Sequence, residues 1–450
     1  MTSFEKYPEY QATKYPWIGD LPNNWNVRRL KEVGRLFGGA GFPHEYQNVQ
    51  GEELYFYKVG DLSLSENGKT LLASPHTISK ETARVLRATI VPKSAIVYAK
   101  IGAALLLNRR RMTTAVCCID NNMTAYVTEA EEVIPEWAFY WLSTIDFGEH
   151  VNPGAVPSFS EGYQSVLPIP VPPVEEQKVI AHFLDFKTAQ IDALIAKKKA
   201  LLDKLAEKRT ALISHSVTKG LDPSVPMRDS KVKWLGSIPQ SWKETRVKFL
   251  GELILGLTYS PDDVVSDGGT LVLRSSNVQE GKISLDDCVY VSCNIPKKVI
   301  TKVDDILICS RNGSRALIGK CALLTEEVSN QAFGAFMTVL RSKHARFLYY
   351  VLNSTLFKFQ SGRFLTSTIN QLTMQTLGDF EIALPPEETQ LNIVSYLDMA
   401  TAVIDAQCSK AQSVIDRLTE YRSAMITNAV TGKIDVRGFA IPQLAKGVAS

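Results

Sequence analysis

Long hydrophobic runs are absent from this 450-residue sequence, and so is any sign of export. No stretch of 18 or more apolar residues occurs, and residues 1–8 lack the basic and then apolar pattern of a signal peptide. We therefore expect a cytoplasmic protein. Because 45% of the residues are hydrophobic, the chain can bury the cores of roughly two to four ordinary domains without disulfide or metal staples.

The sequence contains few cysteines and histidines, and its net charge is small. The seven cysteines are odd in number and include no Cys-x-x-Cys pair, which argues against a disulfide framework or a zinc ribbon. We interpret them as reduced thiols, most of them in cores. The six histidines are scattered, and the net charge of +3 is only mildly basic. Composition therefore excludes a histone-like protein that binds phosphate over its whole surface.

Catalytic motifs are missing as well. The sequence has no Asn-Pro-Pro-aromatic methyltransferase motif, no Walker A loop and no His-Glu-x-x-His motif. The segment Gly38–Gly41 resembles a cofactor loop. A related segment 217 positions later (255 − 38), Leu255–Thr258, lacks most of the glycines. We interpret Gly38–Gly41 as a turn at the end of a strand, and we expect no metal and no catalytic residue in this chain.

A long internal repeat organises the chain. The segment from Trp17 to Trp25 returns from Trp234 to Trp242, a shift of 217 positions (234 − 17). The segment around Gln177, which follows a Pro-Pro pair, returns around Gln390, a shift of 213 positions (390 − 177). Two anchors at nearly equal offsets indicate that a whole module is duplicated. Between the anchors most residues differ, so we expect one scaffold with two different surfaces.

The segment before each Pro-Pro pair is expected to form a mixed globular domain. Short apolar and β-branched runs alternate with Gly, Asn, Asp and Pro, which is typical of strands and loops. The aromatic stretches 137–142 and 347–352 are expected to be packed helices rather than base-stacking surfaces. Residues 96–102 align with residues 306–313 through a one-residue insertion, which matches Lys100 to Arg311.

After each Pro-Pro pair the pattern becomes helical. Residues 175–217 and 387–430 contain no Gly or Pro, so each predicts one helix of about 43 residues, about 65 Å long. Apolar residues recur every seven positions, which predicts a coiled-coil seam. The predicted seam consists of Leu184, Ile191, Leu205, Leu212, Leu397, Ile404, Leu418 and Met425, with Lys198 and Ala411 near its centre.

Two pairings are open to these helices. Each follows a globular domain, so the two helices of one chain can pair antiparallel, and Gly220 with Pro223 and Pro226 marks a turn into the second domain. The alternative is that each helix pairs with another molecule. We favour internal pairing, which gives an α+β fold with two similar mixed domains, two antiparallel coiled-coil helices and a pseudo-twofold repeat.

Two similar but non-identical domains joined by long helices suit DNA, because modules that read one face of a duplex must be spaced by helical turns. The order of variable domain, Pro-Pro-led helix, variable domain and second such helix resembles the specificity subunits of Type I restriction-modification systems across essentially the whole chain. The Trp-x-Gly-x-x-Pro-x-x-Trp openings and the Val-Thr helix ends at Val217 and Val430 are similar to that family. One departure is Thr389, which replaces the usual Glu before Gln390; we expect no change of fold from it.

The resemblance implies a subunit without chemistry of its own. It implies target-recognition domains at residues 1–172 and 219–383, spacer helices at 173–218 and 384–432, and a C-terminal tail at 433–450. It implies recognition of an asymmetric, bipartite double-stranded DNA site and docking of two modification subunits. In that family the modification subunits use S-adenosylmethionine to methylate adenine, and motor-nuclease restriction subunits use ATP and Mg for cleavage. We expect this chain to bind no cofactor.

Candidate DNA contacts are polar and basic residues in the variable domains, because Arg and Lys read guanine or hold phosphate and Asn reads adenine. In the first domain they are Lys58, Asp61, Lys100, Asn108, Arg109, Arg110 and Arg111. In the second they are Arg274, Ser276, Asn277, Arg311, Asn312, Arg315, Lys320 and Asn370, the last within the hydroxyl-rich segment 366–371. Turn chemistry or a solvated loop is the plainer interpretation of each.

Two further hypotheses remain open. The basic run Lys197–Lys199 could follow phosphates across a spacer, or it could be an ordinary solvated helix face. For the whole chain, the alternative is an adaptor that joins proteins through two domains on a coiled coil without DNA specificity. An enzyme that acts on nucleic acid alone would require a catalytic set of residues that the sequence lacks.

Overall fold

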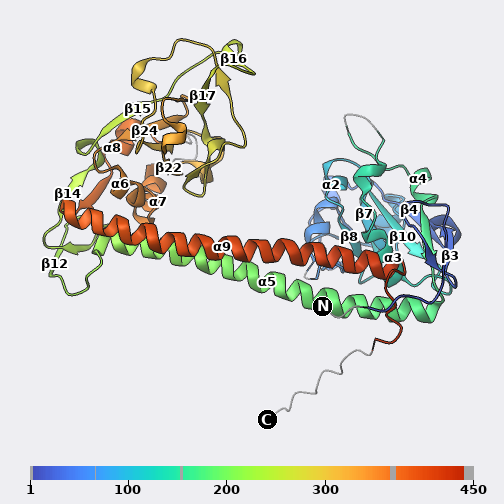
Figure 1. The fold of residues 1–450 in the computed structure, drawn as a ribbon. Helices are drawn as coiled ribbons and strands as arrows, with labels where there is room; N and C mark the ends of the chain where they lie inside the picture. Colours follow the sequence, from blue (N-terminus) through green and yellow to red (C-terminus); the bar gives the residue numbers. More distant parts are fainter. Residues whose placement is uncertain (1–3, 66, 153–155, 365–370, 440–450) are drawn as a thin grey trace. The chain divides into compact units, whose positions relative to one another are not determined.

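The computed structural model describes residues 4–65, 67–152, 156–364 and 371–439 and divides into two compact units (Figure 1). The first unit comprises Met1–Lys199 and Ser413–Ser450, and the second comprises Ala200–Gln412. Each unit therefore takes part of both long helices. Within the described ranges, no helix is both long and apolar enough to cross a membrane.

The first unit is built on a four-stranded antiparallel sheet. Its order is β4 (Gly34–Gly38), β10 (Met123–Thr128), β7 (Ile96–Ala99) and β8 (Arg110–Met112). A smaller sheet has the order β6 (Thr77–Ile78), β5 (Leu54–Tyr57) and β9 (Cys117–Ile119), with β5 and β9 parallel. The remaining elements are β1 (Tyr10–Gln11), β2 (Leu21–Pro22), β3 (Asn26–Arg29), β11 (Pro168–Val171), α1 (Lys80–Val85), α2 (Ala103–Leu106), α3 (Pro135–Ser143) and α4 (Glu161–Ser165).

The second unit repeats this sheet strand for strand. Its main sheet has the order β15 (Glu252–Leu255), β24 (Met337–Arg341), β21 (Ile306–Cys309) and β22 (Cys321–Leu323), and β17 (Thr270–Leu273) pairs parallel with β23 (Ala332–Phe333). The other elements are β12 (Met227–Asp229), β13 (Ser237–Pro239), β14 (Lys243–Arg246), β16 (Val264–Val265), β18 (Val278–Gln279), β19 (Lys282–Ile283), β20 (Tyr290–Val291), β25 (Glu381–Leu384), α6 (Ala345–Leu352), α7 (Thr355–Phe364) and α8 (Met374–Gly378). The duplication predicted from the sequence is confirmed.

The same side-chain contacts join both copies to their long helices. Tyr140 in α3 donates a hydrogen bond to Asp185 and Tyr350 in α6 donates one to Asp398, each at 2.5 Å. The amide of Gln177 donates to the Pro172 carbonyl at 2.8 Å, and Gln390 repeats this contact with Pro385. These pairs explain why the Pro-Pro-led motif survives in both copies: it fixes the start of each helix against its domain.

The long helices are α5 (Val174–Lys219) and α9 (Glu387–Val430). In the first unit Arg422 contacts Asp192 at 2.8 Å, and in the second Arg209 contacts Asp405 at 3.2 Å. The two pairs have the same sum of residue numbers, so both units contain the predicted antiparallel pairing in one register. The predicted seam is confirmed: Leu184, Ile191, Leu205, Leu397, Ile404 and Met425 are buried, and Leu212 and Leu418 are half-buried.

The predicted cores also agree with the structure. Residues 137–142 are all buried in α3, and five of the six residues 347–352 are buried in α6. The indole nitrogens of Trp137 and Trp141 donate to the carbonyls of Pro170 and Pro168 at 2.8 Å, so a buried polar atom is satisfied in each ring. The aromatic stretches therefore pack rather than stack on bases. All seven cysteines are free, and four of them are buried.

The glycine-rich segment at the end of β4 is a close approach between backbones. A Cβ on Gly39 would lie 1.9 Å from the Asp120 carbonyl oxygen, and one on Gly256 would lie 2.2 Å from the Gly334 oxygen. Short parallel bridges, Ala40 to Asp120 and Leu257 to Gly334, form at these points. Both copies keep a glycine at this place, Gly39 or Gly256, because a side chain there would collide with the neighbouring backbone. The interpretation of the segment as a strand end is confirmed.

Candidate nucleic-acid interface

Two of the candidate contact residues support loops instead of facing solvent. Asp61 is 7% exposed and accepts a hydrogen bond from the Lys58 backbone at 2.7 Å. Asn277 is fully buried: it accepts from the Arg274 backbone at 2.8 Å and donates to the Ser284 and Asp287 carbonyls. These residues occupy the same place in the two copies. Because their polar atoms are already used, their selection as DNA contacts is corrected to a structural role.

The three arginines of the basic run Arg109–Arg111 differ in how deeply they are buried. Arg109 is exposed, whereas Arg110, on β8, is 5% exposed and lies 3.7 Å from the centre of the Phe147 ring. Its guanidinium donates to the carbonyls of Asn108 and Ile145. Burial lowers the pKa of Arg110 to about 10. Arg110 is therefore a core residue, which corrects its selection as a DNA contact, while Arg109 is exposed and forms no ion pair with the residues that the structure describes.

The remaining candidates of the first unit are partly engaged. Asn108 has a left-handed backbone (φ 53°) and donates to Asp146 at 2.7 Å, so it shapes the turn before β8. Arg111 is half-buried and donates to the Gly68 carbonyl, and Lys58 donates to Gln47 at 2.9 Å. Lys100 is half-buried beside Gly38. These three cations are half-buried: Lys58 and Lys100 directly follow β5 and β7, and Arg111 lies in the middle of β8.

Among the candidate contact residues of the second unit that the structure describes, the exposed cations are Arg311 and Arg315. Asn312 donates to the Ser275 hydroxyl at 3.0 Å, Lys320 donates to the Val278 carbonyl at 2.7 Å, and Arg274 pairs with Asp287 at 2.8 Å. The hydroxyl of Ser276 is buried without a partner. Asn370 lies outside the described residues. The loops after β17 and β21 are thus bound to each other, and Arg311 projects from them.

One surface residue escaped the sequence analysis. Phe336 is 58% exposed, and its ring lies 5.2 Å from the guanidinium carbon of Arg311. No periodicity signalled it, because it stands in a turn just before β24. The signal that could have found it is the alignment of the copies: position 336 precedes Met337 as Asn122 precedes Met123, so the same place carries a different side chain.

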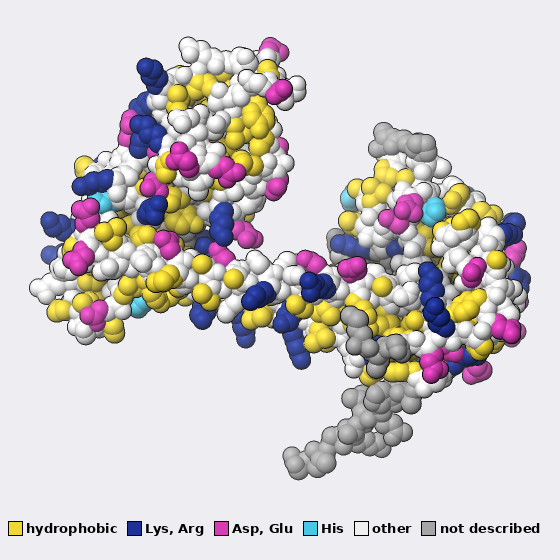
Figure 2. Space-filling view, in the orientation of Figure 1, with side chains coloured by type: hydrophobic (Ala, Val, Ile, Leu, Met, Phe, Trp, Pro, Cys, Tyr) yellow, Lys and Arg dark blue, Asp and Glu magenta, His cyan; other side chains and the backbone are white. Residues whose placement is uncertain are grey.

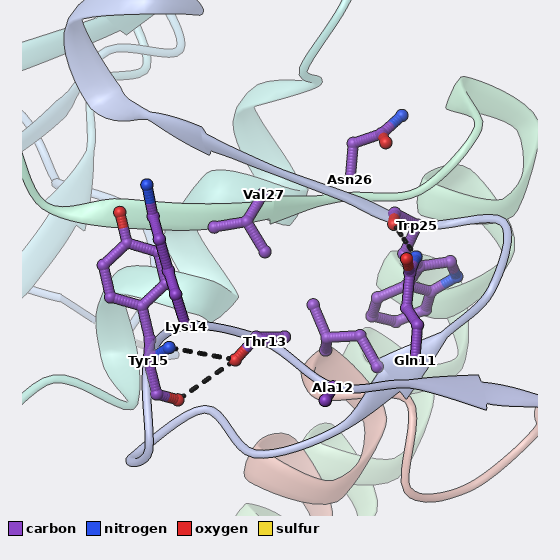
Figure 3. A pocket seen from close by; sticks show the side chains of 9 residues that line it. Gln11, Ala12, Thr13, Lys14, Tyr15, Trp25, Asn26 and Val27 are labelled. Atoms are coloured by element: carbon purple, nitrogen blue, oxygen red, sulfur yellow. Dashed lines mark hydrogen bonds between the residues drawn. The ribbon is translucent and has the colours of Figure 1, made fainter.

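One described pocket lies at the opening of the first unit, and two of its polar side chains are already hydrogen-bonded. A pocket of about 270 Å³ beside β1 and β3 is lined by Gln11–Tyr15, Leu21 and Trp25–Val27 (Figure 3). Its Gln11 amide already donates to the Trp25 carbonyl at 2.7 Å, and its Thr13 hydroxyl bonds to Tyr15. Among the described residues, no group of three His, Cys, Asp or Glu side chains could hold a metal ion.

Basic side chains are spread over the surface. Figure 2 shows Lys and Arg interspersed with acidic side chains on the globular parts, and several basic side chains along the long helices. On α5 the exposed ones are Lys178, Lys197, Lys199, Lys204 and Lys208. This arrangement suits contacts at several separate points along a polyanion more than one continuous basic groove.

Comparison with known proteins identifies the fold. The family model described as Type I restriction modification DNA specificity domain matches residues 22–204 and 239–412, one match in each copy. The chain is similar to the Type I restriction enzyme EcoKI specificity subunit of Escherichia coli K12, at 29% identity over 210 residues, 44% of each chain. It is also similar to the putative MjaX specificity subunit of Methanocaldococcus jannaschii, at 20% identity over 97% of this chain and 99% of that one.

A solved structure has the same fold. It comes from a study of complex assembly and conformational transition of a type I restriction-modification system, and it matches 91% of this chain and 98% of its own with a TM-score of 0.65 at 15% identity. The chain spans less than half the length of the first relatives that it matches. Because the family model covers both copies and most of the sequence, the chain belongs to the Type I restriction-modification DNA specificity family.

Proposed function

We propose that this chain selects the DNA site of a Type I restriction-modification complex and reads an asymmetric, bipartite sequence. The observation that carries the proposal is one sheet framework presented twice with different side chains at equivalent places, such as the half-buried Asn122 in one copy and the exposed Phe336 in the other. Two copies of one framework bind the same kind of ligand, and different surface residues select different bases. The two half-sites therefore differ in sequence.

The proposal assigns the chemistry to partner subunits. Two modification subunits bring S-adenosylmethionine and methylate adenine, and restriction subunits bring ATP and Mg. The specificity chain itself supplies the DNA-reading surfaces and the long helices. This assignment is supported by membership of the family and by the lack of catalytic motifs in the sequence.

The docking surface for the modification subunits is proposed to include the outer face of α9. Tyr396, Met399 and Val403 are 39%, 65% and 59% exposed, and their spacing of three and four residues puts them on one side of the helix. Leu397 and Ile404, which lie on another face of the helix, are buried. An apolar stripe on a helix whose other face is already packed is suited to a protein partner.

The test is to express the chain with its modification subunit in a cell whose DNA lacks that methylation, and to map the methylated adenines. We expect two short, different sequence elements separated by a gap of unread bases. A symmetric or continuous motif would contradict the two-domain proposal. Methylation without sequence preference would favour the protein-joining adaptor, and methyl transfer by the purified chain alone would contradict the assignment of chemistry to the partners.

A further inference from the structure

Arg311 and Phe336 form a cation–aromatic pair on the surface of the second unit. Both side chains are exposed, the guanidinium carbon lies 5.2 Å from the ring centre, and Arg311 forms no ion pair with the described residues. The ring restricts the rotamers of the arginine and leaves the N–H groups at the guanidinium edge free to bind.

The backbone beneath the pair is fixed. The Phe336 carbonyl accepts hydrogen bonds from the backbone amides of Ser310 and Arg311 and from the Ser310 hydroxyl, each at 3.0 Å. The Met337 amide donates to the Gly334 carbonyl at 2.8 Å, which closes the turn before β24. Arg311 also forms an antiparallel bridge with Gln371. The two side chains are thus presented on a rigid support, as a recognition residue requires.

The first unit has the same support with other side chains. The strand partners Ala99 and Met123 correspond to Cys309 and Met337. The Lys100 amide donates to the Asn122 carbonyl at 2.8 Å, as Ser310 does to Phe336. Lys100 therefore corresponds to Ser310, and the match of Lys100 to Arg311 inferred from the sequence is off by one residue.

By this correspondence, Ile101 is the counterpart of Arg311. Ile101 is 37% exposed and forms an antiparallel bridge with Ser158, as Arg311 does with Gln371. The two copies therefore share this backbone but carry different side chains on it, as expected where two half-sites require different bases. Asn122 and Ile101 in the first unit cannot make the contacts of an arginine backed by a ring.

We propose that Arg311, supported by Phe336, reads a guanine in the half-site bound by the second unit. The inference rests on the proposed function. The planar guanidinium offers two parallel donors to O6 and N7 of guanine in the major groove, the geometry that makes arginine the commonest reader of guanine. Phe336 is a positioning residue that fixes the plane of the arginine. Asn122, at the place of Phe336, gives the first unit an amide there, so guanine is not the base read at this position of the other half-site.

The experiment compares methylation motifs of the assembled complex carrying Arg311→Lys, Arg311→Ala, Phe336→Ala or Phe336→Tyr. Lysine keeps the charge but loses the two parallel donors. We expect Arg311→Lys and Arg311→Ala to lower discrimination at one guanine roughly ten- to a hundredfold and to leave the other half-site unchanged. Phe336→Ala should relax the same position less, and Phe336→Tyr, which keeps the ring, should preserve it. The matched control is Arg346→Lys, an exposed residue of α6 that pairs with Asp304.

Each outcome is decisive. A wild-type bipartite motif that stays unchanged in both Arg311 variants overturns this inference and leaves the proposed function standing. A loss of binding at all sites in Arg311→Ala, with the full motif kept in Arg311→Lys, identifies a phosphate contact and also overturns it. A wild-type complex without sequence preference overturns the proposed function itself.

Discussion

Glu176 joins the opening of the first unit to the start of α5. Its carboxylate accepts hydrogen bonds from the Tyr7 hydroxyl at 2.7 Å, the Trp25 indole at 3.0 Å and the Asn24 amide at 2.8 Å. Burial and the bond to Glu176 raise the pKa of Tyr7. Thr389 stands at the equivalent place in the second copy, so the carboxylate is missing there, although Trp242 is kept as the counterpart of Trp25. The second copy has the same sheet framework without it, as expected from the sequence. Arg228 binds Glu244 and the Trp242 carbonyl, as Gln11 binds the Trp25 carbonyl in the first unit.

Glu176→Gln should destabilise the first unit. A glutamine oxygen in the place of Oε1 can still accept from Tyr7 and Trp25, but the amide group then faces the Asn24 amide and that hydrogen bond is lost. The two bonds that remain go to a neutral acceptor, which binds more weakly than a carboxylate. We expect a cost of about 1–3 kcal/mol, measured as a lower urea midpoint followed by the fluorescence of the tryptophans. The control is the adjacent Glu175→Gln: Glu175 has a side chain 85% exposed and pairs only with Lys178, so its loss should cost less than about 1 kcal/mol. Equal midpoints for the two variants would contradict the role of Glu176.

Substitution of Arg110 should lower the stability of the protein, whereas substitution of Arg109 should leave its stability nearly unchanged. Arg110→Gln removes the stack on Phe147 and leaves buried carbonyls without donors, so we expect a loss of about 2 kcal/mol of stability. Arg109→Gln should leave stability within about 0.5 kcal/mol and, if Arg109 contacts a phosphate, reduce the slope of log affinity against log salt by about one. Chemical denaturation and DNA-binding titrations at several salt concentrations measure both. An unchanged slope removes Arg109 from the interface.

The sequence could place the candidate residues in loops and short strands but could not orient them. Side chains alternate along a strand, yet which of three consecutive arginines points inward depends on where β8 begins. It also depends on Phe147, a partner 37 positions beyond Arg110 in the chain. Asp61 and Asn277 look like base readers in the sequence because capping a turn and reading a base use the same polar groups. Only their burial separates the two roles.

At the scale of elements, the long helices were the most predictable feature. The lack of Gly and Pro and the heptad spacing fixed their ends to within two residues of the observed bounds, 174–219 and 387–430. The sheets were not predictable in the same way. Most strands have two to five residues, too few for a clear period, and a parallel pair such as β5 with β9 depends on segments about 60 positions apart.

The lysines at the middle of α5 provide a test of the helix as a DNA contact. Lys197 and Lys199 are exposed and Lys198 is half-buried, as expected for a stem that packs while its charge reaches water. If these lysines contact phosphates, replacing all three with Gln should flatten the salt dependence of binding by about one unit for each contact. The charge-matched control replaces the exposed Lys231, Lys233 and Lys243. Equal slopes for the two triple variants and the wild type would identify a solvated face.

At the scale of the whole molecule, the duplication extends to the ends of the long helices. Gly220 and Gly432 follow α5 and α9 with φ of 81° and 65°, a left-handed conformation that ends helices. Each lies against the Pro and Trp of a domain opening: Pro239 and Trp242 for Gly220, Pro22 and Trp25 for Gly432. The repeat could be read from the sequence, but the contact of Gly432 with Pro22 and Trp25 could not. Gly220 is followed directly in the chain by the domain opening that it contacts, whereas the opening that Gly432 contacts lies about 400 residues earlier in the chain.

The contacts of Gly432 with the first unit continue into the segment that was expected to be a C-terminal tail. In its described part, the Asp435 amide donates to the Glu5 carbonyl at 2.8 Å, Val436 is 2% exposed, and Arg437 lies 4.7 Å from the centre of the Tyr7 ring. These contacts within the first unit take the place of the covalent link that runs from Gly220 into the second unit. A non-covalent contact of this kind leaves no periodic signal in a sequence, which is why it could not be predicted.

The proposed use of the helices as a spacer gives a prediction for the whole complex. One heptad inserted after Lys199 of α5 and one after Gln412 of α9, at the sequence boundaries of the two units, keeps the apolar seam in register and lengthens the pair by about 10 Å. At about 3.4 Å per base pair, the unread gap of the methylation motif should grow by about three base pairs, with both half-sites unchanged. The control is the same insertion in α5 alone, which puts pairs such as Asp192 with Arg422 and Arg209 with Asp405 in conflicting registers and should abolish methylation. A gap of unchanged length in the double insertion would show that the spacing of the half-sites is set by contacts other than the helices.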